Sequence, residues 1–211
     1  MKRDRKPTKR SVPVFRLTLG ALYVALFALA GNVPVLAAIQ VAGIPVTLQV
    51  FLIAMMGLTL GVRGGLTAYG AVLVLTLCGL PMMAGGRGGA AVLLGPTCGY
   101  IYGWVFLLVL LGLYADRGMP RLLHKKLWGM SIHLPVSFAV GLAGLALDYL
   151  CGSAALAALA AVSGRTLAEM PALLLSSLAF LPGDLIKLGL ASFFSLCLFA
   201  KPAFSRMMRA V

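Results

Sequence analysis

The chain has 211 residues, of which 61% are hydrophobic and only 11% are charged. Soluble domains carry about 25% charged and about 45–50% apolar residues, so the charged residues here are too few to cover a water-soluble globule. The excess apolar surface predicts an all-α polytopic membrane protein. The net charge of +13 is spread over basic clusters between apolar segments, a pattern that favours cytoplasmic loops and lipid headgroups over nucleic acid as partner.

The apolar segments predict the membrane spans, since a helix needs about 20 mostly apolar residues to cross the hydrocarbon. Segment 167–180 is apolar but short, and we expect a helix near the surface or an extension of the last span. We find no linker, so one transmembrane domain is expected over residues 1–211, with a basic cytoplasmic segment at residues 1–13. The six expected spans are residues 14–30, 46–60, 64–80, 99–114, 132–150 and 182–200.

The distribution of basic residues predicts the orientation of these spans. With the N-terminus inside, fifteen of the 18 lysines and arginines fall on inner segments, and the expected outer loops hold only Arg87 and Arg165. Cytoplasmic loops are the ones enriched in Lys and Arg, so both termini are expected in the cytoplasm. An alternative is a signal peptide cleaved after Ala28-Leu29-Ala30, which would leave five spans.

Three ionisable residues fall within or close to the expected spans, where a charge costs about 2.5–3.5 kcal/mol and therefore suggests a function. Asp184 and Lys187 are three residues apart and share a helix face. Pro182 fits the first turn of that helix. The pair is either a binding site or an ion pair that fixes helix packing. For Asp148, near the outer end of the fifth span, we expect a structural role at the interface.

A glycine-rich outer loop joins the third and fourth expected spans, with seven glycines among residues 79–100. Irregular backbone near membrane depth is tolerated where it is buried or lines a cavity. We therefore expect a lid over a pocket, with a loose solvent loop as the alternative. The glycines lack the spacing of a phosphate-binding loop, so this chain is not expected to hydrolyse ATP.

The chain shows no pattern typical of a metal site. Its two histidines and four cysteines are isolated and lack the spacing of zinc or redox motifs; they are His124, His133, Cys78, Cys98, Cys151 and Cys197. Ala21 and Ala25 lie one turn apart in the first span. Small residues at this spacing allow close helix contact in lipid, either within the chain or with a partner.

Four motifs in order resemble the biotin-specific S component (BioY) family of energy-coupling factor transporters, over nearly all of the membrane portion. They are Ile44-Pro45-Val46-Thr47-Leu48-Gln49, Leu60-Gly61-Val62-Arg63-Gly64-Gly65, the loop from Gly79-Leu80-Pro81 to Gly95-Pro96-Thr97-Cys98-Gly99-Tyr100, and Phe180-Leu181-Pro182-Gly183-Asp184-Leu185-Ile186-Lys187. Each motif is weak alone, but four with consistent spacing are specific.

The resemblance implies a six-helix subunit, not an enzyme, that captures biotin on the outer side of a bacterial cell membrane. It implies that Asp184 and Lys187 contact biotin; by position and chemistry, Gln49, Gly85, Gly86, Thr97 and Tyr100 are expected to supplement them. No cofactor is expected.

The same resemblance implies that the Ala21 and Ala25 stripe faces a transmembrane coupling subunit, whose ATPase partners supply the energy. Arg87 departs from the family pattern. It pairs either with the carboxylate of biotin or with lipid phosphate, and we favour the second. Rival interpretations are an S component for thiamine, riboflavin or another vitamin, and an intramembrane aspartyl protease using Asp148 and Asp184. The protease is disfavoured because Lys187 would hold Asp184 ionised.

Overall fold

The computed structural model describes residues 11–32, 40–41, 44–45, 48–119, 126–162, 178 and 180–209. Two two-residue strands form an antiparallel hairpin in which Gln40 pairs with Pro45. All other elements are helical. In chain order the elements are α1 (Ser11–Asn32), β1 (Gln40–Val41), β2 (Ile44–Pro45), α3 (Gln49–Leu77), α4 (Ala90–Leu93), α5 (Cys98–Leu113), the π-helical η1 (Tyr114–Gly118), α7 (Lys126–Val162), α9 (Leu181–Ala200) and α10 (Pro202–Arg209).

Five helices in the described part of the chain are long and apolar enough to cross a membrane. The prediction of six separate spans is therefore not confirmed, because the second and third expected spans both belong to α3. The fifth span was predicted too short: α7 has 37 residues and continues to Val162. Most of the expected helix at 167–180 lies outside the described residues.

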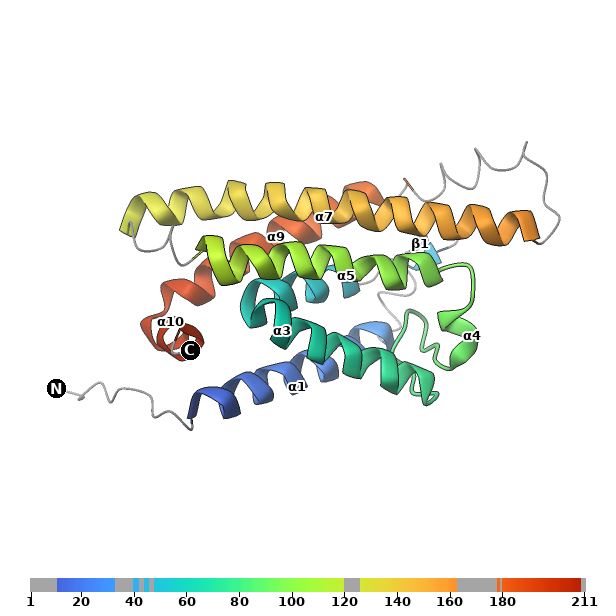
Figure 1. Cartoon of the computed structure of the whole chain (residues 1–211), viewed down its shortest axis with the longest axis horizontal. Coiled ribbons are helices and arrows are strands. Elements are labelled where there is room, and N and C mark those ends of the chain that lie inside the picture. Colours follow the sequence, from blue (N-terminus) through green and yellow to red (C-terminus); the bar gives the residue numbers. More distant parts are fainter. Residues whose placement is uncertain are drawn as a thin grey trace.

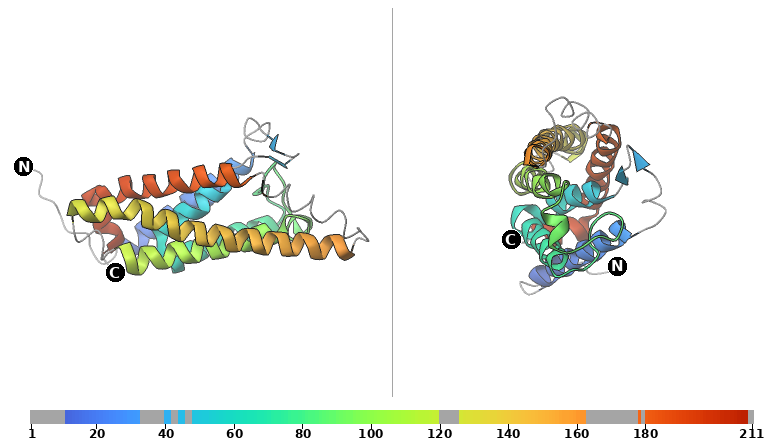
Figure 2. Two further views of the ribbon diagram at one scale, coloured as in Figure 1. Left: turned by 90° about the horizontal axis from the view of Figure 1, so that it is seen from above. Right: turned by 90° about the vertical axis from the view of Figure 1, so that its right-hand side faces the viewer.

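The helices lie along one common direction, with α5 between α3 and α7 (Figures 1 and 2). Glycines permit the close approach of α5 and α7. A Cβ on Gly103 would collide with Asp148, and one on Gly144 would lie 2.7 Å from the Cα atom of Leu107. Gly99 and Gly103 are four residues apart, which is a small-xxx-small spacing. This contact fixes the position of Asp148 and its neighbours on α7 relative to α5.

The helix α3 is interrupted at Gly61, whose backbone has a φ of 71° and a ψ of −172°. Residues nine apart in a straight helix are separated by about 13 Å along the axis, yet a Cβ on Gly65 would lie 3.4 Å from the carbonyl oxygen of Met56. The chain therefore turns back at Gly61. Asp116 of η1 stabilises the turn, because its Oδ2 accepts a hydrogen bond from the backbone N–H of Val62 at 3.0 Å.

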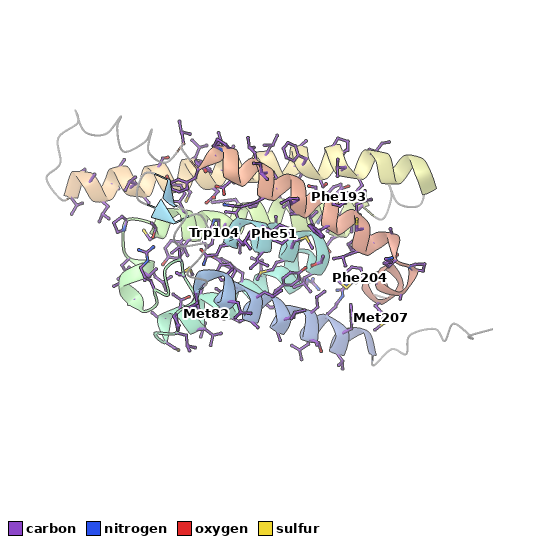
Figure 3. The ribbon with its side chains drawn as sticks, turned by 180° about the vertical axis from the view of Figure 1, so that it is seen from behind. Phe51, Met82, Trp104, Phe193, Phe204 and Met207 are labelled. Carbon is purple, nitrogen blue, oxygen red and sulfur yellow. The ribbon has the colours of Figure 1, made fainter. Side chains whose placement is uncertain are left out.

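The start of α1 and the C-terminal helix α10 lie at one end of the bundle (Figures 1 and 2). There Arg16 donates a hydrogen bond of 2.7 Å to the carbonyl oxygen of Met208, and the rings of Phe15 and Phe204 meet edge to face at 6.0 Å. Figure 3 shows Phe204 near this end and Met82 and Trp104 toward the other. Basic residues near a helix C-terminus complement its dipole, so Arg16 helps to hold α10 against α1.

His133 is fully buried in α7 and belongs to a polar network near the α10 end. Its Nδ1 lies 2.8 Å from the hydroxyl of Tyr114, and its Nε2 lies 3.0 Å from the hydroxyl of Ser195. Ser195 in turn donates to the carbonyl oxygen of Ser192 at 2.8 Å. His133 thereby links α9 to α7 and η1. Among the described residues there is no group of His, Cys, Asp and Glu that could hold a metal ion.

Candidate ligand-binding site

A cavity of about 140 Å³ lies at the end of the bundle opposite α10. Its walls come from the start of α3, the loop before α4, the N-terminal half of α5, the middle of α7 and the first turns of α9. The lining residues are Gln49, Val50, Met83, Ala84, Arg87, Val92, Thr97, Tyr100, Ile101, Trp104, Asp148, Tyr149, Phe180, Asp184 and Lys187. Most of this wall is apolar or aromatic, with a few polar groups placed among the apolar ones, as is usual for small-molecule sites.

Asp184 and Lys187 form an ion pair in the first turns of α9. The Nζ atom of Lys187 lies 2.8 Å from Oδ1 of Asp184, and the two residues are 9% and 7% exposed respectively. Pro182 lies in the first turn of this helix, where its missing N–H costs no hydrogen bond. Asp184 follows within the same turn, so its carboxylate also lies near the positive end of the helix dipole.

Tyr149 of α7 provides a second donor to the same carboxylate. Its hydroxyl donates to Oδ2 of Asp184 at 2.8 Å. Its ring meets that of Tyr100 edge to face, with 5.9 Å between the centroids. The close packing of α5 and α7 holds this aromatic pair, because a Cβ on Gly152 would collide with the ring of Tyr100. Each oxygen of Asp184 therefore has one protein donor, and lone pairs remain for a ligand.

The loop between α3 and α4 closes the cavity and is fastened to its surroundings at several points. Gln49 is buried, and its Nε2 donates to the carbonyl oxygen of Met82 at 3.0 Å. Met83 and Arg87 exchange backbone hydrogen bonds of 2.9 and 3.2 Å. The backbone N–H of Gly86 donates to the carbonyl oxygen of Gly31 in α1 at 3.0 Å. These contacts hold this part of the loop, called the cover below, at the cavity wall.

Gly85 and Gly86 form the turn within this cover. Their φ values are 74° and 69°, a region that side-chain-bearing residues rarely adopt. Neither glycine is among the described residues that line the cavity. Both lie in the turn that leads the chain to Arg87. The structure therefore shows that they allow the backbone to turn, and it does not place them in the wall of the cavity.

Five of the residues expected at a binding site do meet at the cavity: Gln49, Thr97, Tyr100, Asp184 and Lys187. They come from three helices and one loop that are far apart in the sequence. Ala21 and Ala25 lie outside the cavity on α1, where both are exposed.

Two residues with other expected roles also line the cavity. Arg87 is exposed at its edge, where its Nε donates to the carbonyl oxygen of Ala84 at 2.9 Å. Asp148 was expected at the interface but is only 2% exposed. Because it is buried in the cavity wall, the sequence-based interface position is wrong.

Trp104 and Tyr149 were missed by the sequence analysis. Trp104 is 8% exposed and packs edge to face on Phe27 and Tyr69 at 5.9 and 6.4 Å. Trp104 follows Tyr100 by four residues and so shares its helix face, a signal that could have identified it. Nothing in the sequence marks Tyr149 as the partner of Asp184, since this contact depends on how α7 and α9 pack.

The chain was compared with protein families, curated proteins and solved structures. The BioY family model matches residues 4–202. The biotin transporter BioY of Rhizobium etli is 33% identical over 83% of this chain and 88% of the relative, and that of Rhodobacter capsulatus is 32% identical over 81% and 86%. The crystal structure of an S component for biotin from an ECF-type ABC transporter superposes with a TM-score of 0.74 at 31% identity. That superposition covers 96% of this chain and all of the other.

Proposed function

Because the chain belongs to the BioY family, we propose that it is the substrate-binding S component of a biotin uptake transporter rather than an enzyme. It captures biotin from the extracytoplasmic side of the bacterial cell membrane. The main observation that supports this proposal is the buried Asp184–Lys187 ion pair in the wall of the cavity, where Tyr149 donates a hydrogen bond to Asp184.

The polar groups of the cavity match those of biotin. The ureido ring of biotin presents two N–H donors and one carbonyl acceptor. The Asp184 carboxylate can accept a hydrogen bond from a ureido N–H group, and the Lys187 ammonium can donate one to the ureido carbonyl oxygen. The thioether ring and valeryl chain are apolar and fit against aromatic side chains such as Trp104 and Tyr100.

Arg87 is the partner that we assign to the biotin carboxylate. Of the two roles considered from the sequence, its place in the cavity wall supports pairing with the ligand over pairing with lipid phosphate. A guanidinium can bind a carboxylate through two parallel hydrogen bonds. Thr97 and Gln49 line the same cavity and supply further hydrogen-bonding groups.

The chain is a multi-pass membrane protein, and we propose that it crosses the membrane six times with both termini in the cytoplasm. The reversal of α3 at Gly61 supports this count, since it divides α3 into two arms that run in opposite directions. The cavity and its cover lie at the end away from the start of α1, on the outer side in this orientation (Figure 1).

We propose that import uses partner subunits, since the described site accounts for binding alone. We propose that the exposed Ala21 and Ala25 stripe of α1 docks on the transmembrane coupling subunit of an energy-coupling factor transporter. ATPase subunits bound to that partner use ATP, and this chain carries no cofactor of its own. Docking then presents the loaded site toward the cytoplasm.

The test is equilibrium binding of radiolabelled biotin to the detergent-purified chain. Tight, stoichiometric binding that unlabelled biotin displaces and thiamine and riboflavin do not would support the proposal. Asp184→Ala should weaken binding at least about tenfold, because it removes the acceptor for a ligand donor. If a well-folded sample binds one of the other vitamins and no biotin, the ligand assignment fails although the architecture stands.

A further inference from the structure

Asp148 is the second carboxylate of the cavity, and its surroundings differ from those of Asp184. Asp148 is 2% exposed, and its Oδ1 atom has no hydrogen-bond partner in the described part of the chain. Asp184, by contrast, has Lys187 on one oxygen and Tyr149 on the other. The cavity wall therefore holds one carboxylate with protein donors on both oxygens and one with an unused acceptor.

The position of Asp148 is fixed by the packing of α7 on α5. Gly103 of α5 faces it, and a Cβ at that position would collide with Oδ1 and lie 2.9 Å from the Cα atom of Asp148. The glycine therefore leaves room for this carboxylate between the two helices. The Oδ1 atom therefore lies against α5, while Asp148 as a residue is part of the cavity wall.

A packing role alone does not account for a carboxylate at this place. Removing a charged group from water without a partner is costly, and buried polar groups are normally hydrogen-bonded. An apolar or amide side chain of similar size would fill the same space at lower cost. A second unused group lies on the facing helix, where the buried hydroxyl of Tyr100 also lacks a partner. Two residues of one cavity wall that each carry such a group point to a ligand with both donors and acceptors.

We propose that Asp148 is a further ligand-contacting residue, whose carboxylate accepts one N–H group of the bound ureido ring. The inference rests on the proposed biotin-binding function. The ureido ring has two N–H groups on opposite sides of its carbonyl, so two carboxylates can each accept one. Asp184 takes one N–H and Asp148 the other, and the pair of contacts selects a cyclic urea over a ligand with a single donor.

The experiment compares binding of biotin and of biotin methylated at either ureido nitrogen to the full chain and to Asp148→Asn. Asparagine keeps the shape of the side chain between α5 and α7. We expect Asp148→Asn to weaken biotin binding about fivefold to tenfold, because the hydrogen bond that the neutral amide oxygen can still accept is about half as strong as one to a charged carboxylate. The analogue methylated at the nitrogen that Asp148 contacts should bind the native chain weakly and lose less than about threefold further in the variant. An equal loss for biotin and both analogues, or no loss for biotin, would overturn the inference.

The matched control is Asp116→Asn, the same chemical change at η1, far from the cavity. Its amide oxygen can still accept from Val62, and biotin affinity should stay within about twofold. The melting temperature without biotin gives an independent readout. Asp148→Asn should melt at the same or a higher temperature than the native chain, whereas a purely structural Asp148 would give a lower one.

A measurement on the native chain covers the case in which the variant does not fold. A hydrophobic carbodiimide reacts with buried carboxyl groups, and peptide mapping by mass spectrometry locates the product. Biotin amide, which lacks the carboxyl group that would itself consume carbodiimide, should protect Asp148 from modification. Modification unchanged by saturating biotin amide would contradict the contact. If the native chain does not bind biotin at all, the proposed function fails first and this inference with it. Native binding with an unaffected Asp148→Asn variant rejects only the inference.

Discussion

Tyr149 shows how a single residue prepares the cavity for a ligand. Its hydroxyl donates to Oδ2 of Asp184, which fixes the carboxylate between Tyr149 and Lys187. A carboxylate held in advance loses less side-chain freedom when it binds. The ring contact with Tyr100 holds the phenol in place. The hydroxyl therefore positions Asp184, whereas the ring contributes to packing.

Removing only the hydroxyl, in Tyr149→Phe, should therefore weaken biotin binding without unfolding the site. A hydrogen bond to a charged group contributes about 1.5–3 kcal/mol. Only the part of this that positions Asp184 affects binding, so the expected loss of affinity is about threefold to tenfold. Equilibrium binding of labelled biotin measures it. Tyr102→Phe is the matched control, because its hydroxyl donates to the carbonyl oxygen of Leu93 outside the cavity wall. An equal effect of both variants would contradict the positioning role.

Arg87 acts at the edge of the cavity, where solvent screens its charge. Exposed ion pairs contribute up to about 1 kcal/mol, so Arg87→Gln should weaken biotin binding by up to about fivefold. Biotin methyl ester lacks the carboxylate and should bind the native chain and the variant equally. Arg63→Gln, an exposed arginine of α3 outside the cavity wall, serves as the control. If Arg87→Gln weakened the ester as much as biotin, the carboxylate assignment would be wrong.

At the level of single elements, α3 depends on one glycine. Gly61 has a positive φ, and a Cβ at this position would collide with the Asp116 carboxylate that accepts from Val62. The turn at Gly61 brings Met56 and Gly65 together and sets both arms of α3 against α5. The expected spans at residues 46–60 and 64–80 leave a break at residues 61–63, and the structure locates the reversal at Gly61.

Gly61→Ala should therefore destabilise the protein by about 1–3 kcal/mol from backbone strain, with a further loss from displacing Asp116. Thermal unfolding in detergent and the yield of monodisperse protein measure this effect. Gly70→Ala lies in the same element, with nothing within 4 Å of the added Cβ, and should be neutral or slightly stabilising. Similar melting temperatures for the two variants would show that the turn tolerates a side chain.

At the level of the whole molecule, the orientation rests on charge. Inner segments are expected to hold fifteen of the 18 basic residues, which supports the proposed orientation with the α10 end of the bundle in the cytoplasm. In that orientation the cavity would lie toward the compartment from which biotin arrives. The reverse orientation would leave the basic clusters on the wrong side of the membrane.

Cysteine labelling in intact cells tests this orientation. After replacement of the four native cysteines by serine, Ala90→Cys and Lys201→Cys place one thiol at an exposed position near each end of the bundle. A membrane-impermeant maleimide should label Ala90→Cys in intact cells and Lys201→Cys only after lysis. The opposite pattern would reverse the orientation. The cysteine-free chain, which should not be labelled, is the background control.

The sequence by itself determined the class of the protein, the approximate position of most membrane helices and a candidate site at Asp184 and Lys187. Composition and the length of the apolar runs decide the class and the helix positions, because only structures that satisfy all backbone hydrogen bonds internally can cross a lipid bilayer. Asp184 and Lys187 could be found because ionisable residues at membrane depth are costly, and because a spacing of three puts them on one helix face.

Only the tertiary structure decided which other residues complete the cavity. Tyr149 reaches Asp184 and Trp104 lines the same wall because glycines let α5 and α7 pack closely. Asp148 is buried rather than interfacial for the same reason. The extent of α7 and the reversal within α3 also depend on contacts between distant segments. Local patterns determine what a segment can be, whereas packing between helices determines which side chains meet.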